Sequence, residues 1–160
     1  MTEQEIRTIL NRQREYFATG ATLSRKFRAE QLGKLKASLQ RHEEELNAAL
    51  QQDLGKSRME SYMCEIGLTL SELTWMQKHL RGLMQEKRVP TPLSQFAAIS
   101  FRSPSPYGTV LIMSPWNYPV LLTLDPLIDA IAAGNTAVVK PSAYAPATAA
   151  VLKNILEECF

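Results

Sequence analysis

The segment from Gly108 to Ser142 constrains the fold more than any other part of this chain. It holds an apolar run at residues 109–113, a helix-length stretch that stops at Gly134, and a second apolar run at residues 136–140. Two apolar runs without polar alternation, joined by a helix-length crossover, predict a parallel βαβ unit with both sheet faces covered. Ligands bind beyond the carboxyl ends of such strands. We therefore expect the functional site just after these two runs.

Helical patterns fill the chain before this segment. Residues 1–20 and 22–54 carry apolar residues at helical spacing. A third helix begins at Ser57, because Ser57 and Glu60 have the spacing of a capping box. Its predicted apolar stripe consists of Met59, Met63, Ile66, Leu70, Leu73 and Leu80. A stripe of this kind indicates either a helical core or a coiled-coil seam, and we favour the core.

The connection between the helical part and the βαβ unit is rich in proline. Residues 88–107 contain Pro90, Pro92, Pro104 and Pro106, which is typical of a linker. A short strand at residues 97–102 is compatible with the sequence, although no pattern requires it. After the second apolar run, the chain enters a helix at Pro146 and ends there. Because sheets usually have about 4–6 strands, we expect this α/β chain to be a fragment or a truncated product.

Composition excludes several classes of protein. Eighteen Lys and Arg against 16 Asp and Glu give a net charge of +2, which is too balanced to indicate a nucleic-acid partner. The first twenty residues do not resemble a secretory signal. No apolar run approaches the roughly 18 residues of a transmembrane segment. With only two cysteines and no disulfide framework, a cytoplasmic, reduced protein is the expectation.

A few residues at the strand ends have the chemistry of a site. Asn117 either caps the following helix or donates its side-chain amide to a developing negative charge. Lys140 is either solvated or binds ligand hydroxyls or phosphate. Cys64 precedes a glutamate and Cys159 follows two. Because a neighbouring carboxylate disfavours the thiolate, neither cysteine is expected to be a nucleophile. The sequence shows no metal-ligand spacing and no G-x-G-x-x-G after either strand.

Four motifs stand out around the predicted βαβ unit: Pro106-Tyr107-Gly108-Thr109-Val110, Ser114-Pro115-Trp116-Asn117-Tyr118-Pro119, Ala132-Ala133-Gly134-Asn135-Thr136 and Lys140-Pro141-Ser142. Together they resemble the aldehyde dehydrogenase superfamily. The upstream residues Gly20-Ala21-Thr22, Arg28, Asp53-Leu54-Gly55-Lys56 and Glu65-Ile66-Gly67 resemble it too. The segment Thr91-Pro92-Leu93 and the compact N-terminus are most similar to the class 3 branch. The resemblance covers essentially all 160 residues.

This resemblance implies roles for the matched positions. Asn117 would be the oxyanion-hole amide that stabilises the thiohemiacetal oxygen, and Tyr118 would lie close to the substrate pocket. Lys140 and Ser142 would lie against the adenosine ribose. The residues expected to line the cofactor path are Ile112, Met113, Ser114, Pro115 and Trp116. The implied activity is the NAD- or NADP-dependent oxidation of aldehydes to carboxylic acids.

The resemblance also divides the chain. Residues 1–87 would form an N-terminal helical segment, residues 88–107 a linker or oligomerisation strand, and residues 108–160 part of a Rossmann-like NAD(P)-binding domain. The family's catalytic cysteine and general-base glutamate lie downstream of this region. We therefore expect the 160-residue chain alone to be inactive, and the full-length enzyme to be a homodimer.

Two further expectations follow from one difference between this chain and the family pattern and from the family's catalytic residues that residues 1–160 do not contain. Ala143 stands where the family commonly has a glutamate that binds the ribose, so NADP should be accepted. The alternative to an enzyme portion is a non-catalytic truncated product that associates with full-length subunits.

Overall fold

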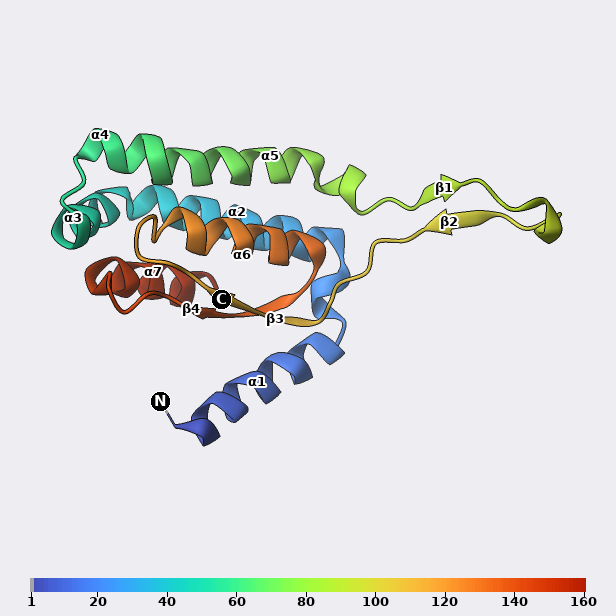
Figure 1. Cartoon of the computed structure of the whole chain (residues 1–160), viewed down its shortest axis with the longest axis horizontal. Helices are drawn as coiled ribbons and strands as arrows, with labels where there is room; N and C mark the ends of the chain where they lie inside the picture. Colours follow the sequence, from blue (N-terminus) through green and yellow to red (C-terminus); the bar gives the residue numbers. More distant parts are fainter. Residues whose placement is uncertain (1) are drawn as a thin grey trace.

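The computed structural model describes residues 2–160 and consists of helices and two small sheets (Figure 1). The N-terminal part contains α1 (Glu3–Ala18), α2 (Arg25–Arg41), α3 (Glu43–Leu54), α4 (Arg58–Ser61), a π-helical turn (Tyr62–Ile66) and α5 (Gly67–Leu83). The rest contains β1 (Lys87–Val89), β2 (Ser100–Arg102), β3 (Thr109–Met113), α6 (Leu121–Ala133), β4 (Thr136–Lys140) and α7 (Pro146–Cys159). Short 3-10 turns lie at Ala21–Leu23 and Leu93–Gln95.

β3 and β4 form the parallel pair that the sequence predicts, and α6 connects them. The register runs from Thr109 opposite Thr136 to Met113 opposite Lys140. α6 ends at Gly134, whose φ of 88° lies in the left-handed region that glycine adopts without strain. The predicted bounds of both strands and the end of the crossover helix are therefore confirmed.

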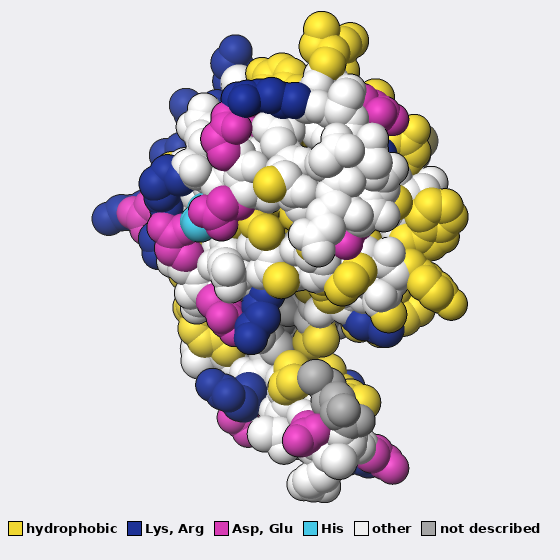
Figure 2. Space-filling model, turned by 90° about the vertical axis from the view of Figure 1, so that its left-hand side faces the viewer, with side chains coloured by type: hydrophobic (Ala, Val, Ile, Leu, Met, Phe, Trp, Pro, Cys, Tyr) yellow, Lys and Arg dark blue, Asp and Glu magenta, His cyan; other side chains and the backbone are white. Residues whose placement is uncertain are grey.

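The expectation that both faces of this sheet are covered is wrong for part of β3. α6 packs on one face, and Ile112 on β3 is buried. Because side chains alternate along a strand, Leu111 and Met113 point to the other face, where they are 63% and 68% exposed. α1 lies on that second face and contacts both strands, but it leaves these two side chains open (Figure 1). A hollow separates α1 from the helical body (Figure 2).

One hydrophobic core joins the helical part to the βαβ unit. α2 packs against α5, α6 and α7, and α3 packs against α7. The largest fully buried apolar side chains of this core are Leu32, Leu35, Leu39, Leu46, Leu50, Ile66, Leu73, Leu124, Ile128, Leu152 and Ile155. Burying a side chain of this size typically contributes about 1.5–3 kcal/mol, so these contacts fix the two parts relative to each other.

The predicted stripe of the third helix is wrong at its N-terminal end. Ser57 caps α4, since its side chain accepts from the Glu60 amide, which confirms one half of the predicted capping box. The reciprocal bond from the Ser57 amide to the Glu60 carboxylate does not form within residues 2–160. Met59 and Met63, however, are 69% and 62% exposed. A π-helical turn inserts one extra residue and rotates the face that follows it. The buried face therefore consists of Ser61, Glu65, Ile66, Thr69, Leu73, Met76 and Leu80.

The N-terminal helices also differ from the expected pattern in detail. The helical region predicted over residues 22–54 is two helices, because His42 leaves helical geometry with φ −92° and ψ 13°. α1 forms as predicted, but no residue of it is buried, and Ile6 of its apolar stripe is 52% exposed.

The proline-rich segment forms a hairpin that extends away from the body (Figure 1). β1 and β2 pair antiparallel, with Lys87 opposite Arg102 and Val89 opposite Ser100. A strand within residues 97–102 is thus confirmed for its last three residues. β1 has only three residues before Pro90, which gives too short a pattern to predict. Leu93 and Phe96 at the hairpin tip are each 88% exposed.

A surface carboxylate links the ends of α2 and α7. Glu158 accepts a hydrogen bond from Ser38 Oγ at 2.7 Å and forms ion pairs with Arg41 and His42. The Ser38 hydrogen bond, followed by those of Arg41 and His42, lowers the pKa of Glu158 to about 2. The folded-state pKa is thus below the ordinary value of 4.5. The resulting stabilisation is complete above about pH 4.5 and is lost as the pH falls towards 2.

Replacing this carboxylate should change how the protein responds to acid. Glu158→Gln should lower the Tm at neutral pH, and its difference from wild type should shrink between about pH 4.5 and pH 2. Thermal unfolding followed by circular dichroism across this range measures the difference. Glu157→Gln is the matched control, because within residues 2–160 Glu157 pairs only with the exposed Lys153 in the preceding turn. A Glu158→Gln difference that is independent of pH would contradict the prediction.

Candidate functional site

The strand ends that the sequence singles out meet at one edge of the sheet. Met113 and Lys140 are partners in the β3–β4 register, and the Ser114 amide donates to the Lys140 carbonyl at 3.2 Å. Ser114 is buried, and its hydroxyl accepts from Thr123 Oγ1 of α6 at 2.7 Å. Ser142 lies two residues beyond β4, where its hydroxyl accepts from the Tyr144 amide. These contacts join the start of one loop to the start of the other.

The loop from Ser114 to Val120 presents its central residues to solvent. Trp116 is 53% and Tyr118 is 38% exposed, and Pro115 and Asn117 are exposed as well. Lys140 is also exposed, and its ammonium has only a 3.4 Å contact with the neighbouring Pro141 carbonyl. Ile112 is different, since it lies in the core beneath α6. The edge thus combines an open amide, an open cation and aromatic rings.

Asn117 does not cap the helix that follows it. α6 begins at Leu121, and the residue in the N-cap position is Val120, which has no side-chain cap. The helix-cap interpretation of Asn117 is therefore wrong. The first amides of a helix still need acceptors, and they find one elsewhere in the chain.

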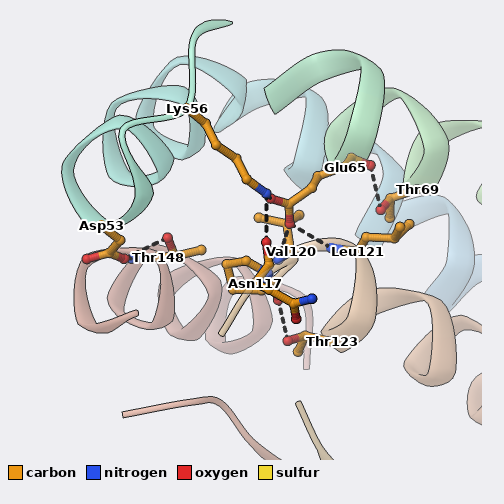
Figure 3. A network of polar contacts seen from close by, with 10 residues as sticks. Asp53, Lys56, Glu65, Thr69, Asn117, Val120, Leu121, Thr123 and Thr148 are labelled. Carbon is orange, nitrogen blue, oxygen red and sulfur yellow. Dashed lines mark hydrogen bonds and ion pairs between the residues drawn. The ribbon is translucent and has the colours of Figure 1, made fainter. Parts of the chain in front are cut away.

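A buried glutamate from the N-terminal helices caps α6. Glu65 is 0% exposed and lies in the π-helical turn. Its Oε2 accepts from the amides of Val120 at 2.7 Å and Leu121 at 3.2 Å (Figure 3). Its own carbonyl accepts from Thr69 Oγ1 at 3.0 Å. A carboxylate at a helix N-terminus also interacts favourably with the helix dipole.

A buried lysine completes this arrangement. Lys56 Nζ lies 2.5 Å from Glu65 Oε1, and both side chains are almost fully buried, at 8% and 0% exposure. The same ammonium donates to the backbone carbonyl of Asn117 at 2.8 Å. It also lies 4.1 Å from the centroid of the Tyr118 ring, within the range of a cation–π contact. The Lys56–Glu65 pair thereby contacts four residues of the loop and the helix start, namely Asn117, Tyr118, Val120 and Leu121.

The same N-terminal part of the chain also holds the start of α7 and the end of α6. Asp53 at the end of α3 accepts from the amides of Ala147 and Thr148, and so caps α7. At the other end of α6, Arg28 NH1 donates to the Ala132 carbonyl at 2.9 Å. Thr22 Oγ1 donates to the Gly134 carbonyl at 2.7 Å. A Cβ at Gly134 would lie 2.4 Å from the Arg28 guanidinium, so only glycine fits.

Comparison with known proteins decides what kind of chain carries this edge. The profile of the aldehyde dehydrogenase family matches residues 1–160. This chain belongs to the aldehyde dehydrogenase family.

The similar aldehyde dehydrogenases are much longer proteins. The 4,4'-diaponeurosporen-aldehyde dehydrogenase of Staphylococcus aureus is 45% identical over 145 residues, which are 91% of this chain and 32% of that protein. Aldehyde dehydrogenase family 3 member H1 of Arabidopsis thaliana is 40% identical, over 96% of this chain and 32% of that protein. The chain therefore spans about a third of the length of these relatives. The resemblance to the class 3 branch is confirmed.

A solved aldehyde dehydrogenase has the same fold. AldH from Staphylococcus aureus, determined in a substrate-bound state, superposes with a TM-score of 0.95 at 42% identity. The match covers 97% of this chain and 34% of AldH. The predicted α/β architecture, with N-terminal helices before the first βαβα part of a larger fold, is confirmed.

The structure gives the upstream aldehyde dehydrogenase motifs a physical role that sequence reasoning missed. Lys56, Glu65 and Asp53 are recognisable in the sequence only as members of motifs. Their targets lie between 55 and 95 residues further along the chain. Thr123 gave no signal at all, because a hydroxyl inside an apolar helix is usually a local contact. One signal was available: a glutamate that falls between apolar positions of a helix needs a partner.

The structure also bears on metal binding, membrane spans and cysteine reactivity. Among residues 2–160, no group of three or more His, Cys, Asp or Glu is arranged to hold a metal ion. No helix in that range is long and apolar enough to cross a membrane. Cys159 is buried, and burial raises the pKa of its thiol, which disfavours the reactive thiolate. Cys64 lies in the π-helical turn and is half-buried.

Gly67 is the residue that permits the π-helical turn. Its amide donates to the Tyr62 carbonyl five residues back, and a Cβ at this position would lie 2.8 Å from that oxygen. Gly67→Ala should therefore force the turn apart, displace Glu65 and lower the free energy of unfolding by about 1–3 kcal/mol. Chemical denaturation measures the loss. Gly82→Ala is the control, because a Cβ there meets nothing within 4 Å, and it should not destabilise the protein. Equal stability of the two variants would contradict the prediction.

Proposed function

We propose that this chain is the N-terminal third of an NAD- or NADP-dependent aldehyde dehydrogenase that oxidises aldehydes to carboxylic acids. The observation that carries the proposal is the loop after β3. It exposes Asn117 beyond the carboxyl end of β3, whose strand partner β4 ends at Lys140, in a chain whose family is established. In this proposal a cysteine outside residues 1–160 attacks the aldehyde carbon. The carbonyl oxygen then gains negative charge and the thiohemiacetal forms.

Asn117 would stabilise this charge. Its side-chain amide makes no hydrogen bond within the described residues and is exposed at the loop surface. A neutral NH2 donor that is already in position needs no reorganisation when the oxyanion develops. Tyr118, the next residue, would provide the wall of the substrate pocket close to the reacting carbon.

The residues of the strand ends are compatible with a nicotinamide dinucleotide. The Lys140 ammonium forms no ion pair within residues 2–160, and Ser142 supplies a hydroxyl two residues further along the chain. Both would bind the adenosine ribose. The cofactor path would follow the β3 end, along the exposed Met113, Pro115 and Trp116 and along the backbone of Ile112 and Ser114, whose side chains are buried. When bound, the cofactor accepts the hydride that the aldehyde carbon loses. Ala143 carries no carboxylate that would repel a 2′-phosphate, which supports the use of NADP as well as NAD.

The hairpin arm supports association between copies. Leu93 and Phe96 at its tip are each 88% exposed, and Phe101 on β2 is 54% exposed. Such apolar side chains on an extended arm favour a homodimer of the full-length enzyme. They also support the alternative function, a non-catalytic module that binds full-length subunits.

Activity separates the two functions. A full-length enzyme that carries these residues should form NADH or NADPH when an aldehyde is added, assayed with each cofactor in turn. The 160-residue chain alone should form none, because neither Cys64 nor Cys159 is suited to covalent catalysis. Aldehyde-dependent cofactor reduction by the short chain that survives replacement of both cysteines would refute the mechanism. An inactive full-length protein would favour the module.

A further inference from the structure

We propose that the buried Lys56–Glu65 pair is a positioning device for Asn117, and that it thereby controls the rate of aldehyde oxidation. The inference rests on the proposed function, in which Asn117 is the oxyanion donor. Lys56 and Glu65 touch neither substrate nor cofactor in this proposal. They act through the backbone of the loop.

The loop has little support of its own. Residues 114–120 form neither helix nor strand, and Asn117 and Tyr118 lie at the surface. Its ends contact β4 and α6 through Ser114 and Pro119. Its centre is held from behind by the segment that joins α3 to α5. Lys56 holds the Asn117 carbonyl at 2.8 Å, and Glu65 holds the Val120 amide at 2.7 Å.

The geometry directs the Asn117 side chain outward. Its carbonyl points back towards Lys56, whereas its side-chain amide points away from Lys56 (Figure 3). Holding the carbonyl restrains the peptide plane between residues 117 and 118, and with it the backbone position from which the Asn117 side chain starts. The ring centroid of Tyr118, the residue on the other side of that peptide bond, lies 4.1 Å from the same ammonium, so Lys56 contacts both residues.

The Lys56–Glu65 pair can hold the loop in place because its charged atoms all have partners. A lysine ammonium has three donor directions. Here they are directed at a Glu65 oxygen, the Asn117 carbonyl and the face of the Tyr118 ring. The second Glu65 oxygen accepts two amides at the start of α6. A buried hydrogen-bond network whose members all have partners is rigid. A short capping side chain within the loop could satisfy the helix amides, but it would not hold the Asn117 carbonyl.

Rate is sensitive to such positioning. A misplacement of about 1 Å by a change away from the reacting atoms can lower the rate by about 10²-fold. Lys56 and Glu65 are therefore expected to affect kcat through the direction of the Asn117 amide. Cofactor binding at Lys140 and Ser142 should change much less, because neither residue contacts the pair.

The test uses the double variant Lys56→Met/Glu65→Gln in the full-length enzyme. Removing both charges avoids leaving one of them buried and unpaired. We expect kcat to fall by about 10- to 100-fold, with little change in the KM for the cofactor. Lys36→Met is the matched control, because Lys36 Nζ also makes a long-range hydrogen bond, to Thr74 Oγ1 at 2.7 Å, but does not contact the loop. It should retain the wild-type kcat.

A double-mutant cycle distinguishes positioning from general damage. If the pair acts through Asn117, adding Lys56→Met/Glu65→Gln to Asn117→Ala should lower kcat no further. Additive losses would overturn the proposal, as would a double variant with wild-type kcat or an equal loss in the control. If the double variant does not fold, Lys56→Arg takes its place, since it keeps the charge but changes the contact with the Asn117 carbonyl.

Hydrogen exchange tests the anchor without relying on catalysis. The amides of residues 114–121 should exchange faster in Lys56→Met/Glu65→Gln than in wild type, and unchanged exchange would overturn the anchor itself. A wild-type enzyme that does not oxidise aldehydes would instead refute the proposed function. The two failures are therefore distinguishable.

Discussion

Asn117→Ala should lower the kcat of the full-length enzyme by about 10²–10³-fold, which corresponds to about 2.7–4 kcal/mol of lost transition-state stabilisation. The reason is that its amide would be the donor aimed at the developing oxyanion, and no donor replaces it. Because Asn117 is exposed and caps no helix, its removal should change the free energy of unfolding by less than about 0.5 kcal/mol. Steady-state kinetics and thermal unfolding of the same samples measure both effects.

Asn117→Asp provides the internal control for this result. It keeps the size of the side chain but replaces the NH2 donor by an acceptor that repels negative charge. Its kcat should fall at least as far as that of Asn117→Ala. Activity retained per folded molecule in either variant would show that Asn117 is not the oxyanion donor.

Glu65→Ala should destabilise the fold by about 3–5 kcal/mol, because it removes one partner of a buried ion pair. Lys56 would lose its ion-pair partner at 8% side-chain exposure, and the amides of Val120 and Leu121 would lose their acceptor. Domains of this size are stable by only about 5–15 kcal/mol, so the loss is a large fraction of the total. Urea denaturation followed by circular dichroism gives the free energy of unfolding.

Glu44→Ala is the matched comparison for Glu65→Ala. Glu44 pairs with Arg58, but the two side chains are 69% and 67% exposed, so its loss should cost less than about 1 kcal/mol. A Glu65→Ala variant no less stable than Glu44→Ala would mean that the buried pair does not hold α6 to the N-terminal helices.

Local patterns in the sequence determined the elements of the βαβ unit. The apolar runs set β3 and β4 at their observed bounds, and Gly134 set the end of α6. Ser57 set the start of α4. Each of these features depends on residues within one turn or one strand, so neighbouring residues suffice to predict it. The combined motifs at residues 106–142 also indicated the family, which the comparison confirmed.

Only the tertiary structure decided which side of the third helix faces inward. A 3.6-residue periodicity assumes a regular helix, and the π-helical turn at Tyr62–Ile66 breaks that assumption. As a result Met59 and Met63 lie outside and Glu65 lies inside. Gly67 carries the information for this turn, but a glycine inside a helical pattern has several explanations in sequence alone.

The anchoring of the candidate site was likewise decided in three dimensions. Glu65 meets the Val120 amide across 55 residues, and Lys56 meets the Asn117 carbonyl across 61. Nothing in the local sequence specifies these encounters, because they exist only once α5 and α6 pack against α2 and bring the two segments together. The sequence determined that Asn117 and Lys140 follow parallel strands. The packing of distant helices decided what holds Asn117 in place.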